Sequence, residues 1–201
     1  MTEKEKMLNG KPYKAFGEEL SSERQYAKEM IFDYNNLSPK EINKHNEIIK
    51  KIFGKVGNDF YIEPPFRCDY GYNISVGKNF YVNYNCTILD CAAVTIGDNV
   101  MFAPNVSLFT AGHPIHFEWR NKAIEYAFPI SIGNNVWVGG GVIVNPGITI
   151  GNNVVIGSGS VVTKDIPSNC IAVGNPCKVI KQITDEDKQY YFKNLKIDNT
   201  I

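Results

Sequence analysis

The sequence predicts a mainly β protein, a parallel β-helix of six-residue repeats with helices at its ends. The main observation is that β-branched residues recur at every sixth position over 132–162. A second series, also mostly β-branched, follows four positions after each of them. The first series is Ile132, Val138, Val144, Ile150, Ile156 and Val162, and the second is Val136, Val142, Ile148, Val154, Ser160 and Ile166. Signals for helix starts flank the repeat. A period of six held this long is typical of short sides that each bury an aliphatic residue.

The glycines and asparagines explain how such a chain turns. Five of the six residues in the first series are followed by Gly or Asn, which tolerate the positive φ angles of corners. With three sides to a coil of about 18 residues, Ile132 is expected beneath Ile150 at about 4.8 Å. The period alone does not decide the hand of the coil, although the usual crossover rule favours right-handed connections.

The same spacing returns upstream in two sets. They are Val76, Val82 and Ile88, followed by Ile96, Phe102 and Leu108. The longer step between the sets predicts a two-residue insertion. From 109 to 129 the period fails, and this segment contains two of the three histidines. A long excursion from a rigid scaffold is usually functional, so we expect a projecting loop there.

Two helices are predicted before the coils. Ser22 and Gln25 have the spacing of a capping box, which predicts a helix to about Tyr34. The run SPKE at 38–41 has a capping Ser followed by Pro, and predicts a second helix that ends near Gly54. His45 lies in that second helix, where we expect a residue at the boundary of the core.

A short final helix is predicted from Thr184 and Asp187, with Tyr190 and Tyr191 on it. Terminal helices would cover the open strands of the end coils. The predicted divisions are a helical cap at 1–58, a β-helix at 59–182 with the loop 109–129, and a C-terminal helix and tail at 183–201.

The composition argues against several classes of function. The 21 Lys and Arg balance 21 Asp and Glu, which argues against binding to nucleic acid or to an anionic membrane. The first residues lack an apolar signal region and no stretch approaches the roughly 18 apolar residues of a membrane span, so we expect a cytoplasmic protein. The five cysteines form no CxxC pair and are expected to be reduced: Cys68, Cys86, Cys91, Cys170 and Cys177.

Few residues are candidates for chemistry. His113 follows Gly112 and precedes Pro114, and such a constrained histidine suits a general base as well as an ordinary loop position. With His116 it forms an HxxH pair, but no third metal ligand is evident nearby. Near the end of the repeat, Lys164, Lys178 and Lys181 could receive a phosphate-bearing ligand or form a solvated charged face.

The hexapeptide run, the loop FTAGHPIH, the segment from IGNNVWVGGG to VVTKDIP and the ending GNPCKVIK resemble the galactoside/maltose O-acetyltransferases. The resemblance extends to about Phe192 and includes the helical N-terminus. It implies a left-handed parallel β-helix, and direct transfer of an acetyl group from acetyl-CoA to a sugar hydroxyl. It also implies a homotrimer with sites between subunits, and no metal.

The resemblance assigns roles to single residues. It places the general base at His113, Glu125 as acceptor of the other imidazole N–H, and the backbone N–H of Gly140 at the oxyanion. Acceptor binding falls on Asp69, Tyr81 and Asn83. Coenzyme binding falls on Trp137, Ser158, Thr163, Lys164, Lys178 and Lys181.

Two departures concern the acceptor side. Ala15 replaces an acid that touches the acceptor in the galactoside enzymes, and Cys91 stands at a position that is acidic in some relatives. The resemblance therefore specifies the chemistry more closely than the acceptor, which it implies to be galactoside, maltose or glucose-like. Acetylation of a xenobiotic hydroxyl, such as an antibiotic, is therefore the alternative. A metal-bound β-helix of the carbonic-anhydrase type requires three placed histidines, and His45 is too remote. A non-catalytic scaffold is the last alternative.

Overall fold

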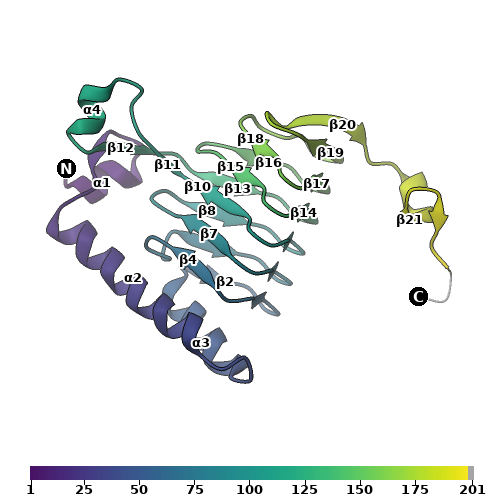
Figure 1. Cartoon of the computed structure of the whole chain (residues 1–201), viewed down its shortest axis with the longest axis horizontal. Helices are drawn as coiled ribbons and strands as arrows, with labels where there is room; N and C mark the ends of the chain where they lie inside the picture. The colour runs from purple at the N-terminus through teal and green to yellow at the C-terminus, as the bar shows by residue number, and fades with distance from the viewer. Residues whose placement is uncertain (199–201) are drawn as a thin grey trace.

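The computed structural model describes residues 1–198 and shows a stack of parallel coils preceded by helices (Figure 1). Within those residues three parallel sheets run along the stack. Face A contains β2 (Lys55–Val56), β5 (Ile74–Val76), β8 (Val94–Ile96), β13 (Ile130–Ile132) and β16 (Thr149–Ile150). Face B contains β3 (Tyr61–Ile62), β6 (Tyr81–Val82), β9 (Met101–Phe102), β14 (Val136–Val138), β17 (Val154–Ile156), β19 (Cys170–Val173) and, antiparallel to it, β20 (Lys178–Gln182). Face C contains β4 (Phe66–Cys68), β7 (Cys86–Leu89), β10 (Ser107–Phe109), β15 (Ile143–Val144) and β18 (Val161–Val162).

The strand register confirms the predicted stacking. Ile132 lies opposite Ile150 on face A, and Val138 lies opposite Ile156 on face B. Val76 pairs with Ile96, which confirms the two-residue insertion in the upstream coils. All residues of the first series are 3% exposed or less, so the period of six corresponds to an internal column of aliphatic side chains.

Asparagine ladders turn the corner between faces A and B. Asn99, Asn135 and Asn153 all have positive φ, between 53° and 57°. Asn99 Nδ2 donates to Asn135 Oδ1 at 3.2 Å, and Asn153 Nδ2 donates to Asn169 Oδ1 at 3.0 Å. Asparagine is therefore used twice here, because it tolerates the left-handed backbone and its amide bonds to the next coil.

The predicted cap helices exist, but their starts were wrong. α2 (Glu18–Asn36) begins after Gly17, and the Ser22 hydroxyl donates to the Glu19 carbonyl inside the helix, so the predicted Ser22 capping box is absent. α3 (Ile42–Ile52) begins after Glu41 rather than at Ser38, although its end near Gly54 is confirmed. The Asn35 amide exchanges hydrogen bonds of 2.9 Å with the N–H and C=O of Phe66, which attaches α2 to the first coil.

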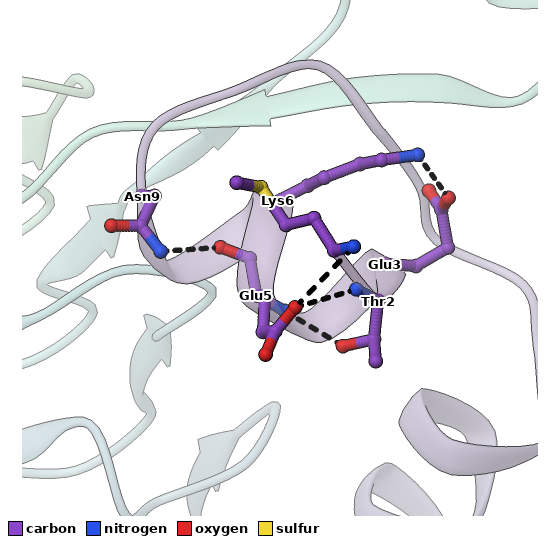
Figure 2. Close-up of polar contacts among 6 residues, drawn as sticks. Thr2, Glu3, Glu5, Lys6 and Asn9 are labelled. Carbon is purple, nitrogen blue, oxygen red and sulfur yellow. Dashed lines mark hydrogen bonds and ion pairs between the residues drawn. The ribbon is translucent and has the colours of Figure 1, made fainter.

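A helix that we did not predict precedes these two. α1 (Glu3–Leu8) starts at a capping box between Thr2 and Glu5 (Figure 2). Glu3 accepts from Lys6 Nζ and from the backbone N–H of Lys14, both at 2.5 Å. Glu3 thereby joins α1 to β1 (Tyr13–Lys14), which lies beside the projecting loop.

The projecting loop is structured. It contains β11 (Ala111–Gly112), α4 (Phe117–Asn121) and β12 (Ile124–Ala127), and it forms a sheet of order β1-β12-β11 with the N-terminal strand. Figure 1 shows α4, β12 and α1 gathered at one side of the stack. The loop is therefore attached to the cap as well as to the coils.

The C-terminal segment differs in part from the expected helix. Thr184 and Asp187 do form a capping box, but it starts a short 3₁₀ helix, η1 (Asp185–Gln189). Tyr190 and Tyr191 belong to β21 (Tyr190–Phe192), which pairs with β22 (Leu195–Lys196), so their placement on a helix was wrong. The last part of the predicted tail, 199–201, lies outside the described residues. None of the helices found in 1–198 combines the length and apolarity needed to cross a bilayer.

Candidate active site

Two corners of the coil carry the candidate residues. The corner between faces C and A, here the CA corner, follows β4, β7 and β10 and carries Asp69, Asp90 and the start of the projecting loop. The corner between faces B and C, here the BC corner, follows β6, β14 and β17 and carries Asn83, Gly140 and Ser158. Each corner is repeated in successive coils, so residues far apart in sequence lie along one edge of the stack.

His113 directly follows β11 at the CA corner side, and about half of its side chain is exposed. Its Nδ1 lies 3.1 Å from the carbonyl oxygen of Ile124. A carbonyl oxygen can only accept, so this contact places the proton of the neutral ring on Nδ1. Nε2 then keeps its lone pair, as a general base requires.

Glu125 lies on the other side of that ring. Its Oε1 is 3.8 Å from His113 Nε2, which is beyond hydrogen-bonding distance. The expectation that Glu125 accepts the other imidazole N–H was therefore wrong, because the Ile124 carbonyl occupies that position. The carboxylate instead stands near the nitrogen that would gain a proton.

Asp69 lies close enough to Glu125 to interact with its charge, and it contacts Cys91. The Cys91 thiol donates to Asp69 Oδ2 at 3.4 Å, and burial raises the pKa of both groups. Cys91 therefore stays a neutral thiol, and its S–H is a donor beside the Asp69 carboxyl group. A cavity of about 550 Å³ opens beside Asp69 and is also lined by Lys28, Asn35 and Arg67. Its polar side chains suit a ligand rich in hydroxyl groups.

Asp90 holds the turn that carries Asp69. Its Oδ1 accepts from the backbone N–H of Asp69 at 3.0 Å and of Tyr70 at 2.9 Å. Its Oδ2 is buried, and no partner for it is found in residues 1–198. Burial raises the pKa of Asp90 to about 7.

A raised pKa means that the folded protein favours protonated Asp90, whereas the unfolded chain loses this proton near its ordinary value of 3.8. The folded state therefore binds more protons between about pH 4 and 7, and the contribution of Asp90 to stability falls as the pH rises through this range. Asp90→Asn keeps the Oδ1 acceptor and removes the charge. We expect the variant to be more stable than wild type at pH 8, with the difference shrinking toward pH 4. Urea unfolding midpoints at the two pH values check this, and a constant difference would contradict it.

The BC corner offers a free backbone donor. The N–H groups of Gly139 and Gly141 donate to Ile156 O at 2.8 Å and Pro104 O at 2.9 Å, but the N–H of Gly140 between them has no partner within residues 1–198. A Cβ at Gly139 would lie 2.6 Å from the backbone N of Ser158, so this position requires glycine. Gly140 itself is partly exposed, so its unpartnered N–H is the candidate donor to a ligand at this corner.

An exposed apolar column lies on the outer side of face B, next to this corner. Tyr61, Tyr81, Met101 and Trp137 stack at successive register positions and are 37–51% exposed. Trp137, Tyr81, Asn83 and Ser158 thus share one region of the molecule. Side chains of this kind are typical of a surface that receives a ligand or another chain.

The other predicted coenzyme residues lie elsewhere in the chain. Thr163 and Lys164 follow β18 at the CA corner, whereas Lys178 and Lys181 lie on β20. Lys181 forms an ion pair with Asp187. The predicted lysine cluster is therefore split between two places. The predicted acceptor residues are divided in the same way. Tyr81 lies on face B and Asn83 at the BC corner, whereas His113 and Asp69 lie at the CA corner.

The remaining candidate residues lie in surroundings that are typical of a structural role. All five cysteines are buried and free. His45 is 9% exposed and meets the Tyr34 ring edge-on at 4.9 Å, as a core-boundary residue should. Over the described part of the chain, no three His, Cys, Asp or Glu side chains come together as metal ligands.

Three site features escaped prediction: the Ile124 carbonyl, Asp90 and Tyr13, which contacts Glu125. Ile124 acts through its backbone, which has no sequence signature. Tyr13 is 112 residues from Glu125, so no local pattern could pair them. Asp90 could have been found from its position, because it directly follows the buried strand β7.

Comparison with known proteins identifies the family. The family model described as "Maltose acetyltransferase hexapeptide capping motif" matches residues 6–57, and "Bacterial transferase hexapeptide (six repeats)" matches 129–164. The galactoside O-acetyltransferase of Escherichia coli K12 is 48% identical over 197 residues, which are 98% of this chain and 97% of that protein.

Solved structures agree. A maltose O-acetyltransferase from Clostridium difficile 630 is 58% identical, with a TM-score of 0.91, covering 92% of this chain and 99% of its own. A galactoside acetyltransferase in complex with coenzyme A is 49% identical, with a TM-score of 0.96 over 99% and 100% of the two chains. Identity at this level over nearly the whole length shows that this chain is an acetyltransferase of the galactoside/maltose O-acetyltransferase family.

Proposed function

We propose that the protein transfers the acetyl group of acetyl-CoA to a hydroxyl of a sugar, a galactoside, maltose or glucose-like acceptor. The observation that carries this proposal is the contact of His113 Nδ1 with the Ile124 carbonyl, which leaves Nε2 unprotonated. The names of the relatives support the sugar, and the relative that holds coenzyme A supports the donor.

The reaction needs no covalent enzyme intermediate. The acceptor oxygen attacks the thioester carbonyl while His113 Nε2 takes the hydroxyl proton. The carbonyl oxygen becomes an oxyanion, which the free Gly140 N–H stabilises. The tetrahedral intermediate then expels the thiolate of coenzyme A, and the imidazolium returns the proton to that sulfur. Glu125 stabilises the imidazolium while it exists.

We assign acceptor binding to Asp69 with Tyr81 and Asn83, and coenzyme binding to Trp137 and Ser158 with Thr163 and Lys164. Lys178 and the ion-paired Lys181 are the proposed contacts of its phosphates. In one chain these residues divide between the CA and BC corners. A homotrimer that sets the CA corner of one subunit against the BC corner of the next would join the two halves.

The test measures thiol release from acetyl-CoA with a panel of acceptors. The proposed function predicts turnover with galactosides, maltose or glucose, and failure with every sugar would contradict it. Xenobiotic hydroxyl compounds belong in the same panel, because the uncharged thiol of Cys91 stands beside Asp69 on the proposed acceptor side. Selective turnover of one of those would favour the xenobiotic alternative.

A further inference from the structure

The N-terminal strand contacts the two residues that flank the His113 ring. In the antiparallel pair of β1 and β12, Lys14 lies opposite Ile124 and Tyr13 lies opposite Glu125. Ile124 supplies the carbonyl at Nδ1, and Glu125 supplies the carboxylate near Nε2. The first strand of the chain therefore pairs with both residues that flank the imidazole.

Tyr13 makes a specific contact there. Its hydroxyl donates to Glu125 Oε2 at 2.7 Å, and its side chain is only 1% exposed. The opposite oxygen, Oε1, is the one that faces His113 Nε2 at 3.8 Å. Cys91 and Asp69 are the other ionisable groups near this carboxylate, and Cys91 also interacts with the Tyr13 hydroxyl. Glu125 is thus held from the side away from the histidine.

The distance of 3.8 Å has a chemical consequence. A carboxylate at this distance favours the imidazolium by its charge, yet leaves Nε2 free of a hydrogen bond. A closer carboxylate would accept a hydrogen bond from Nε2–H of the imidazolium, keep that proton on the ring and occupy the position of the acceptor hydroxyl. We propose that Tyr13 is a positioning residue that restrains Glu125 at this distance, so that His113 can accept the hydroxyl proton. This inference rests on the proposed role of His113.

The test uses Tyr13→Phe, which keeps the buried ring and removes the hydroxyl. Freed from Tyr13, Glu125 is expected to approach His113, so the midpoint of the His113 NMR titration is higher in the variant than in wild type. We expect kcat to fall roughly tenfold while KM for acetyl-CoA is unchanged. An unchanged or lower titration midpoint in the folded variant would overturn the proposal.

Tyr72→Phe is the matched control. The Tyr72 hydroxyl donates to Glu23 Oε2 of α2, also at 2.7 Å, and so forms a comparable tyrosine–carboxylate hydrogen bond that involves neither Glu125 nor His113. It should reproduce any loss of stability without changing the titration or kcat. A second control repeats Tyr13→Phe in a Glu125→Gln background, where a positioning role predicts no further effect on kcat. If Tyr13→Phe lowered kcat in the Glu125→Gln background as much as in wild type, Tyr13 would act through packing alone.

The titration also separates this inference from the proposed function. It needs no turnover, so an inactive wild type with a shifted His113 midpoint in Tyr13→Phe would contradict the function and retain the positioning. An active wild type together with an unshifted His113 midpoint in Tyr13→Phe would support the proposed function and contradict the positioning role.

Discussion

Replacing His113 with alanine is expected to lower kcat for acetyl transfer by about 10²–10⁴-fold, the usual contribution of a general base. The Ile124 carbonyl presents Nε2 as the one unprotonated ring nitrogen, and alanine removes the proton acceptor without disturbing a buried group. Acetyl-CoA affinity should change little, because the proposed coenzyme contacts do not include this side chain. Steady-state kinetics and calorimetry of acetyl-CoA binding measure the two quantities.

His116→Ala is the control for that experiment. His116 lies in the same loop, at the start of α4, and its ring stacks on Phe117. The two variants remove the same side chain from neighbouring positions, so damage to the loop would affect both. We expect near-wild-type turnover for His116→Ala. Near-wild-type turnover for His113→Ala would rule out the proposed mechanism.

Gly140→Pro is expected to lower kcat by about 10²–10³-fold, because proline lacks the N–H proposed to stabilise the oxyanion. The substitution breaks no hydrogen bond within residues 1–198, since that N–H has no partner there. Gly140→Ala keeps the N–H, and its Cβ makes one tight contact, with Pro104 O at 3.3 Å, which a shift of a few tenths of an ångström relieves. The alanine variant should therefore stay close to wild type, and equal losses in both variants would contradict the oxyanion role.

The same variants test whether sites are shared between chains. His113→Ala disables the CA corner, and Gly140→Pro disables the BC corner. If each site combines the two corners of neighbouring subunits, co-refolding equal amounts of both inactive proteins restores about a quarter of the sites. A site formed within one chain predicts no recovery. Sedimentation of the mixture reports the number of subunits directly.

The sequence was most informative where one local rule repeats. Each six-residue side needs one buried aliphatic residue, so the period alone was enough to place Ile132 beneath Ile150. Helix starts were less predictable. Ser22 and Ser38 have the chemistry of caps, but the actual starts are Glu18 and Ile42. In such helices, packing on the coils contributes more than a single cap.

The site was predictable in its residues and less so in its contacts. His113 could be found because its loop interrupts the repeat, but the partner of its Nδ1 is a backbone carbonyl. The pairing of Tyr13 with Glu125 depends on a strand more than 100 residues away in the chain. Both are products of tertiary structure, for which a single sequence has no local signal.

The two ends of the stack are closed by elements outside the repeat: Asn35 of α2 bonds to the first coil, and the antiparallel β20 covers β19 at the other end. The elements that close the stack are thus distinct from the repeated coils that set its length. Coils between those ends could be duplicated or deleted as modules while the closures remain intact, and the protein would stay protected against end-to-end fibril growth.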